Sequence, residues 1–182
     1  MSGSSGQVAV GKVLARRMGD EVCFLVVGRG CANHSPALRA YAEESLAAGV
    51  TAFQVDLSDC THCDSTFLGT LLRLLQACRT KPATTLQLAN PSAAVRQVLH
   101  QMGVTRLFHI TEKSATSQND MTWQQLDDQC HRSQSLPFKQ NAVDAHQALA
   151  SEGGELAQRF GPLAEAMRAE LATLQSPKAP CE

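Results

Sequence analysis

Hydrophobic and polar residues alternate along the first third of the chain in a way that predicts β-strands. Apolar side chains recur imperfectly from Val8 to Leu14, and a stronger apolar run covers residues 21–27. The turn sequence Met18-Gly19-Asp20 separates the two runs. Two strands joined this closely are expected to form an antiparallel hairpin. Gly28-Arg29-Gly30 then breaks the run, and we interpret it as a turn.

From there to residue 110, helical patterns alternate with strand patterns. A helix is predicted over residues 36–48, with Ser35 as its N-cap, Pro36 in the first position and Gly49 past its end. Strands are predicted over 51–57, 84–89 and 107–110. Helices are predicted over 66–79 and from Asn90-Pro91 to Met102. Strands linked through helices run parallel, so the fold class is α/β, with a mixed β-sheet flanked by α-helices.

The last third of the chain has helical patterns only. Residues 114–135 are polar at their start and are interpreted as a linker, in which 123–130 has the composition of a short helix. Residues 136–176 are predicted to form a C-terminal helical hairpin that turns at Gly153-Gly154. Gly161-Pro162 predicts a kink or a new helix start. The hairpin needs a partner surface, either the first domain or a second copy of the chain in a homodimer.

Composition limits the classes of partner. The chain of 182 residues has a formal net charge of −1 and no long basic run, which gives no electrostatic reason to expect nucleic acid or anionic membrane. It has no apolar run of membrane-spanning length, and its first residues lack the features of a signal peptide. Cys23 and Cys78 fall on apolar faces, as reduced buried thiols do. We therefore expect a cytoplasmic protein without membrane insertion.

One segment carries a family resemblance. Residues 55–69 read VDLSDCTHCDSTFLG, an apolar strand ending in Asp-Leu-Ser, a short loop, and the helix opening Asp64-Ser65-Thr66-Phe67-Leu68-Gly69. This segment resembles the hallmark of STAS domains, and the order and spacing of residues 86–108 are similar to the second half of that family. The resemblance covers residues 7–113, which we predict to be a STAS domain. The chain departs from the family pattern at Phe67, where the family has glycine, and at residues 28–31, where it usually has Gly-Glu-Leu-Asp.

Within the STAS family, the chain resembles the anti-sigma factor antagonists. The resemblance implies that Ser65 is phosphorylated by a histidine-kinase-like ATPase that also serves as the anti-sigma factor. It implies a partner-binding face formed by Asp64, Ser65, Thr66, Phe67 and Gly69, with an uncovered hydroxyl at the helix start. The implied function is a non-enzymatic partner switch that regulates transcription. The alternative is a constitutive STAS binding or scaffold subunit, of a stress-signalling assembly or a transport complex, without phosphorylation control.

Several of these residues have simpler interpretations. Ser65 and Thr66 could cap a helix, and Asp64 could complement the helix dipole. Cys60-Thr-His-Cys63 has the spacing of a redox pair or of half a zinc site completed by Cys130-His131, and both readings stay open. His146 lies on an apolar helical face, which is typical of a packed or hydrogen-bonded histidine. No acid, base and nucleophile converge by spacing, so neither an enzyme nor a cofactor is predicted.

Overall fold

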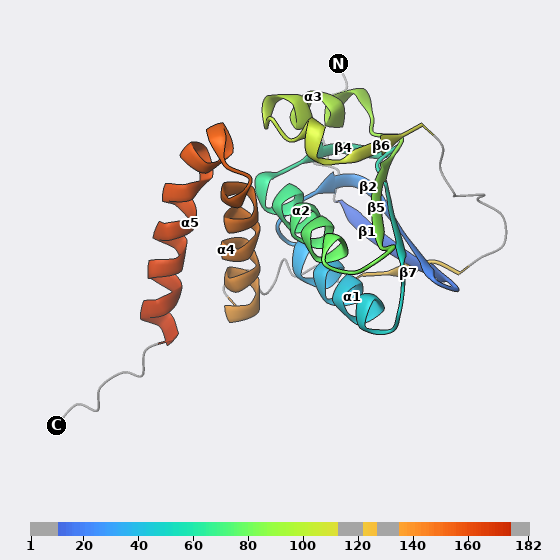
Figure 1. Ribbon diagram of the computed structural model, residues 1–182, viewed down its shortest axis with the longest axis horizontal. Helices are drawn as coiled ribbons and strands as arrows, with labels where there is room; N and C mark the ends of the chain where they lie inside the picture. The colour runs from blue at the N-terminus through green and yellow to red at the C-terminus, as the bar shows by residue number, and fades with distance from the viewer. Residues whose placement is uncertain (1–10, 113–121, 127–134, 176–182) are drawn as a thin grey trace, which may run out of the picture.

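The computed structural model describes residues 11–112, 122–126 and 135–175 (Figure 1). In this part of the chain the strands are β1 (Lys12–Met18), β2 (Glu21–Gly30), β3 (Ala52–Asp56), β4 (Cys60–Cys63), β5 (Thr85–Ala89), β6 (His109–Thr111) and β7 (Gln124–Gln125). The helices are α1 (Ser35–Ala47), α2 (Ser65–Arg79), α3 (Ala93–Gln101), α4 (Leu136–Ser151) and α5 (Gly154–Gln175), with a 3₁₀ turn at Thr105–Leu107.

The strands form one mixed sheet in the order β6-β5-β3-β2-β1-β7, and β4 pairs with β2 off this path. The strands joined through helices pair in parallel, whereas β1 is antiparallel to both β2 and β7. The predicted hairpin is confirmed, because Gly19 turns the chain between β1 and β2 with a φ of 61°. The α/β class with a mixed sheet flanked by helices is confirmed as well.

The second strand of the hairpin is longer than predicted, and one strand was missed. β2 continues through Gly28-Arg29-Gly30, so the interpretation of these residues as a turn was wrong. A register shift lies between Gly28 and Arg29, and Gly28 adopts a φ of 73°, which glycine reaches without strain. The extension pairs with β4. The four residues of β4 carry no apolar alternation, so only the partner strand reveals them as a strand.

Helices α1 and α2 pack on one face of the sheet (Figure 1). Two predicted caps were wrong. Ser35 is the first residue of α1 instead of its N-cap, and its hydroxyl donates to the Cys31 carbonyl 3.2 Å away. Ser92, and not Asn90, caps α3, because the Ser92 hydroxyl accepts from the Val95 N–H at 3.3 Å.

The two C-terminal helices form further layers over α2. Helix α4 packs against α2 and α1, and α5 lies on the outer side of α4 (Figure 1). Gly153 and Gly154, with φ values of 77° and 57°, make the turn between them. Helix α5 runs through Gly161 and Pro162 without a new start. In the described part of the chain no helix combines the length and the apolar character needed to cross a bilayer.

The predicted short helix over 123–130 is corrected where the structure describes it. Gln124 and Gln125 form strand β7 and pair with Ala15 and Leu14 of β1. The next N–H, that of Leu126, donates to the Val13 carbonyl at 2.9 Å. The remainder of that segment, like residues 8–10 of the first predicted strand and most of the predicted linker, lies outside the described residues.

Candidate functional site

The start of α2 is fixed by the Asp64 carboxylate. One of its oxygens accepts the Phe67 N–H at 2.8 Å and caps the helix. The other oxygen accepts the Ala32 N–H at 2.9 Å and so connects this helix to the loop before α1. Two backbone donors that would otherwise lack partners are satisfied by one charged group near the positive end of the helix dipole. The position of the next residue, Ser65, is therefore well defined.

The Ser65 hydroxyl faces α4. Its oxygen lies 3.1 Å from Nε2 of His146, and Nδ1 of the same ring lies 2.8 Å from the Ala142 carbonyl oxygen. A carbonyl only accepts, so Nδ1 carries the proton in this arrangement. In the neutral ring Nε2 is then an acceptor, and the Ser65 hydroxyl donates to it. Ser65 is partly exposed, whereas His146 is 5% exposed. The sequence interpretation of His146 as a packed, hydrogen-bonded histidine agrees with this geometry.

The next residues of the predicted docking face are buried. Phe67 is 0% exposed, and its ring lies against Gly30 of β2, where an added Cβ would be 2.9 Å from two ring atoms. A Cβ on Gly69 would lie 2.3 Å from the Ala145 carbonyl oxygen of α4. Thr66 is 8% exposed. The expectation that the helix start stands uncovered therefore differs from the structure, because Phe67 packs against β2 and α4 covers Gly69.

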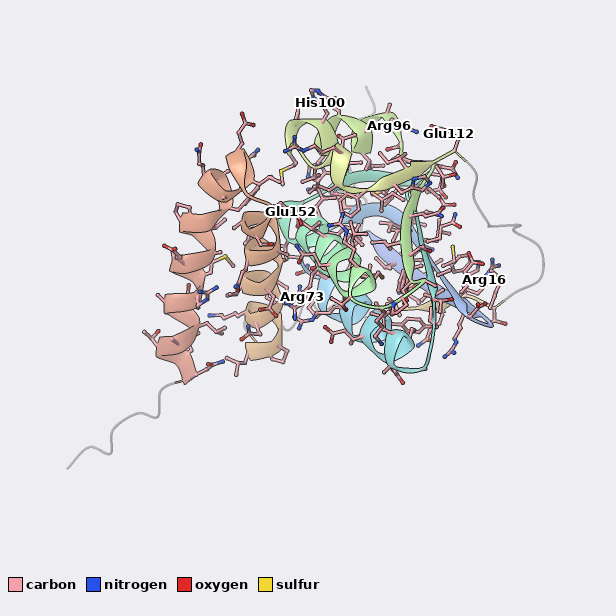
Figure 2. All side chains as sticks on the ribbon, in the orientation of Figure 1. Arg16, Arg73, Arg96, His100, Glu112 and Glu152 are labelled. Carbon is pink, nitrogen blue, oxygen red and sulfur yellow. The ribbon has the colours of Figure 1, made fainter. Side chains whose placement is uncertain are left out.

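Polar contacts join α4 to α1 and α2 around this covered start. Asp144 accepts from the Arg39 guanidinium at 2.6 Å, and the Arg73 guanidinium lies 3.9 Å from the same oxygen. Asn141 donates to the Thr70 hydroxyl at 3.2 Å. Figure 2 shows Arg73 where α4 faces the layer of α1 and α2. Sequence reasoning did not find Asp144, since its arginine partner in α1 is 105 residues away and no local pattern links them.

Strand β4, which leads into Asp64, carries a pair of buried thiols. The sulfur atoms of Cys60 and Cys63 are 3.6 Å apart, and each residue is 1% exposed. The hydrogen bond with Cys63 lowers the pKa of the Cys60 thiol to about 7, and the same interaction raises the pKa of Cys63. The described residues contain no group of three side chains able to hold a metal ion, and Cys130 and His131 lie outside them.

A family model described as "Mlab, STAS domain" matches residues 15–111. The chain belongs to the STAS domain family. The matched segment runs from the middle of β1 to the end of β6, includes α1, α2 and α3, and ends before α4. A search of curated proteins finds no match.

Solved structures similar to this STAS chain include three of anti-sigma factor antagonists. SpoIIAA in its unphosphorylated form has 20% identity, covering 59% of this chain and 90% of that chain, with a TM-score of 0.49. An anti-sigma factor antagonist from Mycobacterium paratuberculosis has 21% identity, covering 57% and 87%, with a TM-score of 0.46. The phosphorylated form of SpoIIAA from Bacillus has 19% identity, covering 59% and 93%, with a TM-score of 0.46.

Proposed function

We propose that this STAS domain is a non-enzymatic protein–protein signalling module of the cytoplasm, in which the segment from Asp64 to Gly69 binds a protein partner. Ser65 is its phosphate acceptor. The partner is a histidine-kinase-like ATPase that acts as kinase and as anti-sigma factor, so the module switches a transcription factor's inhibitor between two partners. The observation that supports this proposal is the position of Ser65, a partly exposed hydroxyl in the first turn of α2 whose oxygen bonds to a side chain outside the sheet core.

A phosphate on Ser65 would change this surface electrostatically. The amino end of α2 tolerates negative charge because its N–H groups and dipole point toward it. However, the Asp64 carboxylate already occupies that end. A phosphate adds close to two more charges at neutral pH and brings a large hydration shell. A partner that fits the neutral hydroxyl would therefore be released, while the fold of the domain would persist.

The contact between Ser65 and His146 superficially resembles a nucleophile with its base, since the ring is also oriented by an acceptor. Two features favour binding over catalysis. The His146 ring, which belongs to α4, is 5% exposed and packs against the ring of Phe160 in α5, with 5.9 Å between the ring centroids. The 270 Å³ cavity between α1 and α2 is lined by other residues, among them Arg39, Leu46 and Thr80. A reacting substrate would need space beside the hydroxyl.

The proposed function is tested by purifying tagged variants from the organism that encodes the chain. Wild type and Ser65→Ala are expected to retain the same ATPase partner, and Ser65→Asp is expected to lose it. Ser58→Asp is the matched control, because Ser58 is exposed on the preceding loop and receives the same charge. Phosphopeptide mapping of the wild type is expected to locate phosphate on Ser65. Retention of the partner by Ser65→Asp, together with an unmodified Ser65, would refute phosphorylation control.

A second candidate is a constitutive STAS subunit of a larger assembly, such as a transport complex. The covered start of α2 favours it, because buried Phe67 and Gly69 leave little of the predicted switch surface accessible. In this case the same partners would co-purify with the wild type, with Ser65→Ala and with Ser65→Asp.

A further inference from the structure

Helix α4 covers the part of α2 to which the proposed function assigns partner binding. His146 holds the Ser65 hydroxyl, and Ala145 lies over Gly69 at a distance that leaves no room for a Cβ. Figure 1 shows α4 between α2 and α5, with α5 as the outermost layer. The hairpin of α4 and α5 therefore lies where a protein partner of this STAS domain would dock.

The chemistry of the covered surface is specific. Arg39 of α1 and Arg73 of α2 both face the Asp144 carboxylate of α4. The side chain of Asp144 is 14% exposed and that of Arg39 is 22% exposed, so this pair is shielded from solvent. One step along α4, Ala145 sits against Gly69 of α2. The surface thus accepts a helix that presents a small residue next to an acidic one.

Further contacts along α2 are both polar and apolar, since Leu149 of α4 and Phe160 of α5 belong to the same core cluster as the buried leucines of α2. Asn141 bonds to Thr70, and the Gln76 side chain donates to Glu152 at 2.9 Å and to Ser151 at 3.1 Å. Figure 2 places Glu152 at the end of α4 that faces α2. A helix that replaces α4 would have to supply equivalent polar partners and equivalent apolar side chains, because buried groups left without them are costly.

We propose that the α4–α5 hairpin is an internal occupant of the docking surface on α1 and α2. A protein partner would displace it with a helix of the same pattern, a small residue opposite Gly69 preceded by an acid that pairs with Arg39 and Arg73. The proposal rests on the proposed function for the location of the docking surface. It adds that the surface is closed in the free protein and that the partner is helical and acidic at one position.

Two variants of the full chain are compared. Both are designed to release the hairpin, but only one of them leaves the surface on α1 and α2 able to bind another helix. Asp144→Arg places a cation against the two arginines and releases α4, while α1 and α2 stay unchanged. Gly69→Ala also expels α4, because its Cβ would meet the Ala145 backbone at 2.3 Å, and it blocks any other helix at the same place. Glu165→Arg is the control for charge, since Glu165 is exposed on α5. Gly161→Ala is the control for the glycine substitution, since no atom lies within 4 Å of its added Cβ.

The first measurement is hydrogen exchange read by mass spectrometry. In Asp144→Arg and Gly69→Ala, peptides from α4 and α5 are expected to exchange faster, and peptides from β1, β2 and β3 to keep the wild-type rates. The two control variants are expected to match the wild type. If the whole chain exchanges faster, the hairpin is an integral part of the fold and the proposal fails. It also fails if α4 stays as protected as in the wild type.

The second measurement is binding of a fluorescent synthetic peptide of residues 135–175, which carries the α4 pattern. Asp144→Arg is expected to bind it at least about tenfold more tightly than the wild type, whose surface is occupied. Gly69→Ala is expected to show no such gain, although its hairpin is released. Equal binding by Asp144→Arg and Gly69→Ala, or no binding by either, would overturn the proposal.

Light scattering of the wild type shows whether the surface is covered by the hairpin of the same chain or by that of a second copy. A monomer is expected, and a dimer that exchanges hairpins would make a second copy the occupant and overturn the proposal. None of these measurements depends on phosphate at Ser65. The surface could therefore prove to bind a helix while phosphorylation control fails, or the reverse.

Discussion

Gly30 and Phe67 form a pair whose sizes are matched across β2 and α2. The ring of Phe67 lies where the side chain of residue 30 would be, and it is 0% exposed. We predict that Gly30→Ala and Phe67→Ala each lower the free energy of unfolding. The double variant should lose less free energy of unfolding than the two single variants lose when their losses are added. This cycle tests whether Phe67 is a core residue or part of an exposed docking face.

The magnitudes follow from the geometry. Truncation of a fully buried phenylalanine lowers the free energy of unfolding by about 3–5 kcal/mol. A Cβ on Gly30 would lie 2.9 Å from Cδ1 and Cε1 of the ring and 3.2 Å from Cζ. The enclosed ring has no space to retreat, so Gly30→Ala is expected to cost about 1–3 kcal/mol. In the Phe67→Ala background those three atoms are gone, and the same substitution should cost less than about 0.5 kcal/mol.

The assay is urea denaturation of the four proteins, followed by circular dichroism and extrapolated to zero urea. A coupling free energy of about 1–2.5 kcal/mol is expected between the two positions. If Phe67→Ala does not fold, Phe67→Leu replaces it, because it removes Cε1 and Cζ. Additive effects within about 0.5 kcal/mol, or a Phe67 variant as stable as the wild type, would refute the assignment of Phe67 to the core.

Three further predictions concern the elements around the site. Asp64→Ala should lower the free energy of unfolding by about 2 kcal/mol in urea denaturation, since two backbone N–H groups lose their acceptor, and Asp64→Asn should lose about half as much. Ser92→Ala should cost about 1–2 kcal/mol because Ser92 caps α3 and donates to a β4 carbonyl at 2.6 Å, whereas Asn90→Gly, at a φ of 45°, should change stability little. Because the hydrogen bond with His34 lowers the pKa of the Cys31 thiol, its alkylation by iodoacetamide, read peptide by peptide, should begin at lower pH than that of an unfolded-chain thiol, and His34→Gln should shift the profile to higher pH.

Much of the sheet could be predicted from the sequence because its signals are local. The alternation in β1 and the apolar run in β2, with a glycine turn between them, need no knowledge of distant residues. The helix over 66–79 follows in the same way from its apolar residues, although its N-cap is Asp64 and not Ser65 or Thr66. Parallel pairing then follows from the helical connections. Strand β4 escaped prediction because only its pairing with the end of β2 makes it a strand.

The surroundings of Ser65 could not be predicted, because they depend on long-range packing. The pattern of α4 indicates an amphipathic helix but not the surface it covers. The close approach of Ala145 to Gly69 and the pairing of Asp144 with Arg39 join segments more than 70 residues apart. Asp64 and Ser65 were correctly placed at a helix start, whereas the burial of Phe67 and Gly69 follows from residues that no motif connects to them.

The central claim is that α4 holds the Ser65 hydroxyl through His146. The most direct test is to measure which ring nitrogen of His146 carries the proton. Long-range nitrogen–proton spectra in alkaline buffer distinguish the two neutral tautomers, and the signal is assigned by its loss in His146→Gln. The account predicts a proton on Nδ1, which donates to the Ala142 carbonyl, and a bare Nε2 that accepts from Ser65. Gly69→Ala, which expels α4, should abolish this preference. A proton on Nε2 in the wild-type protein would contradict the account.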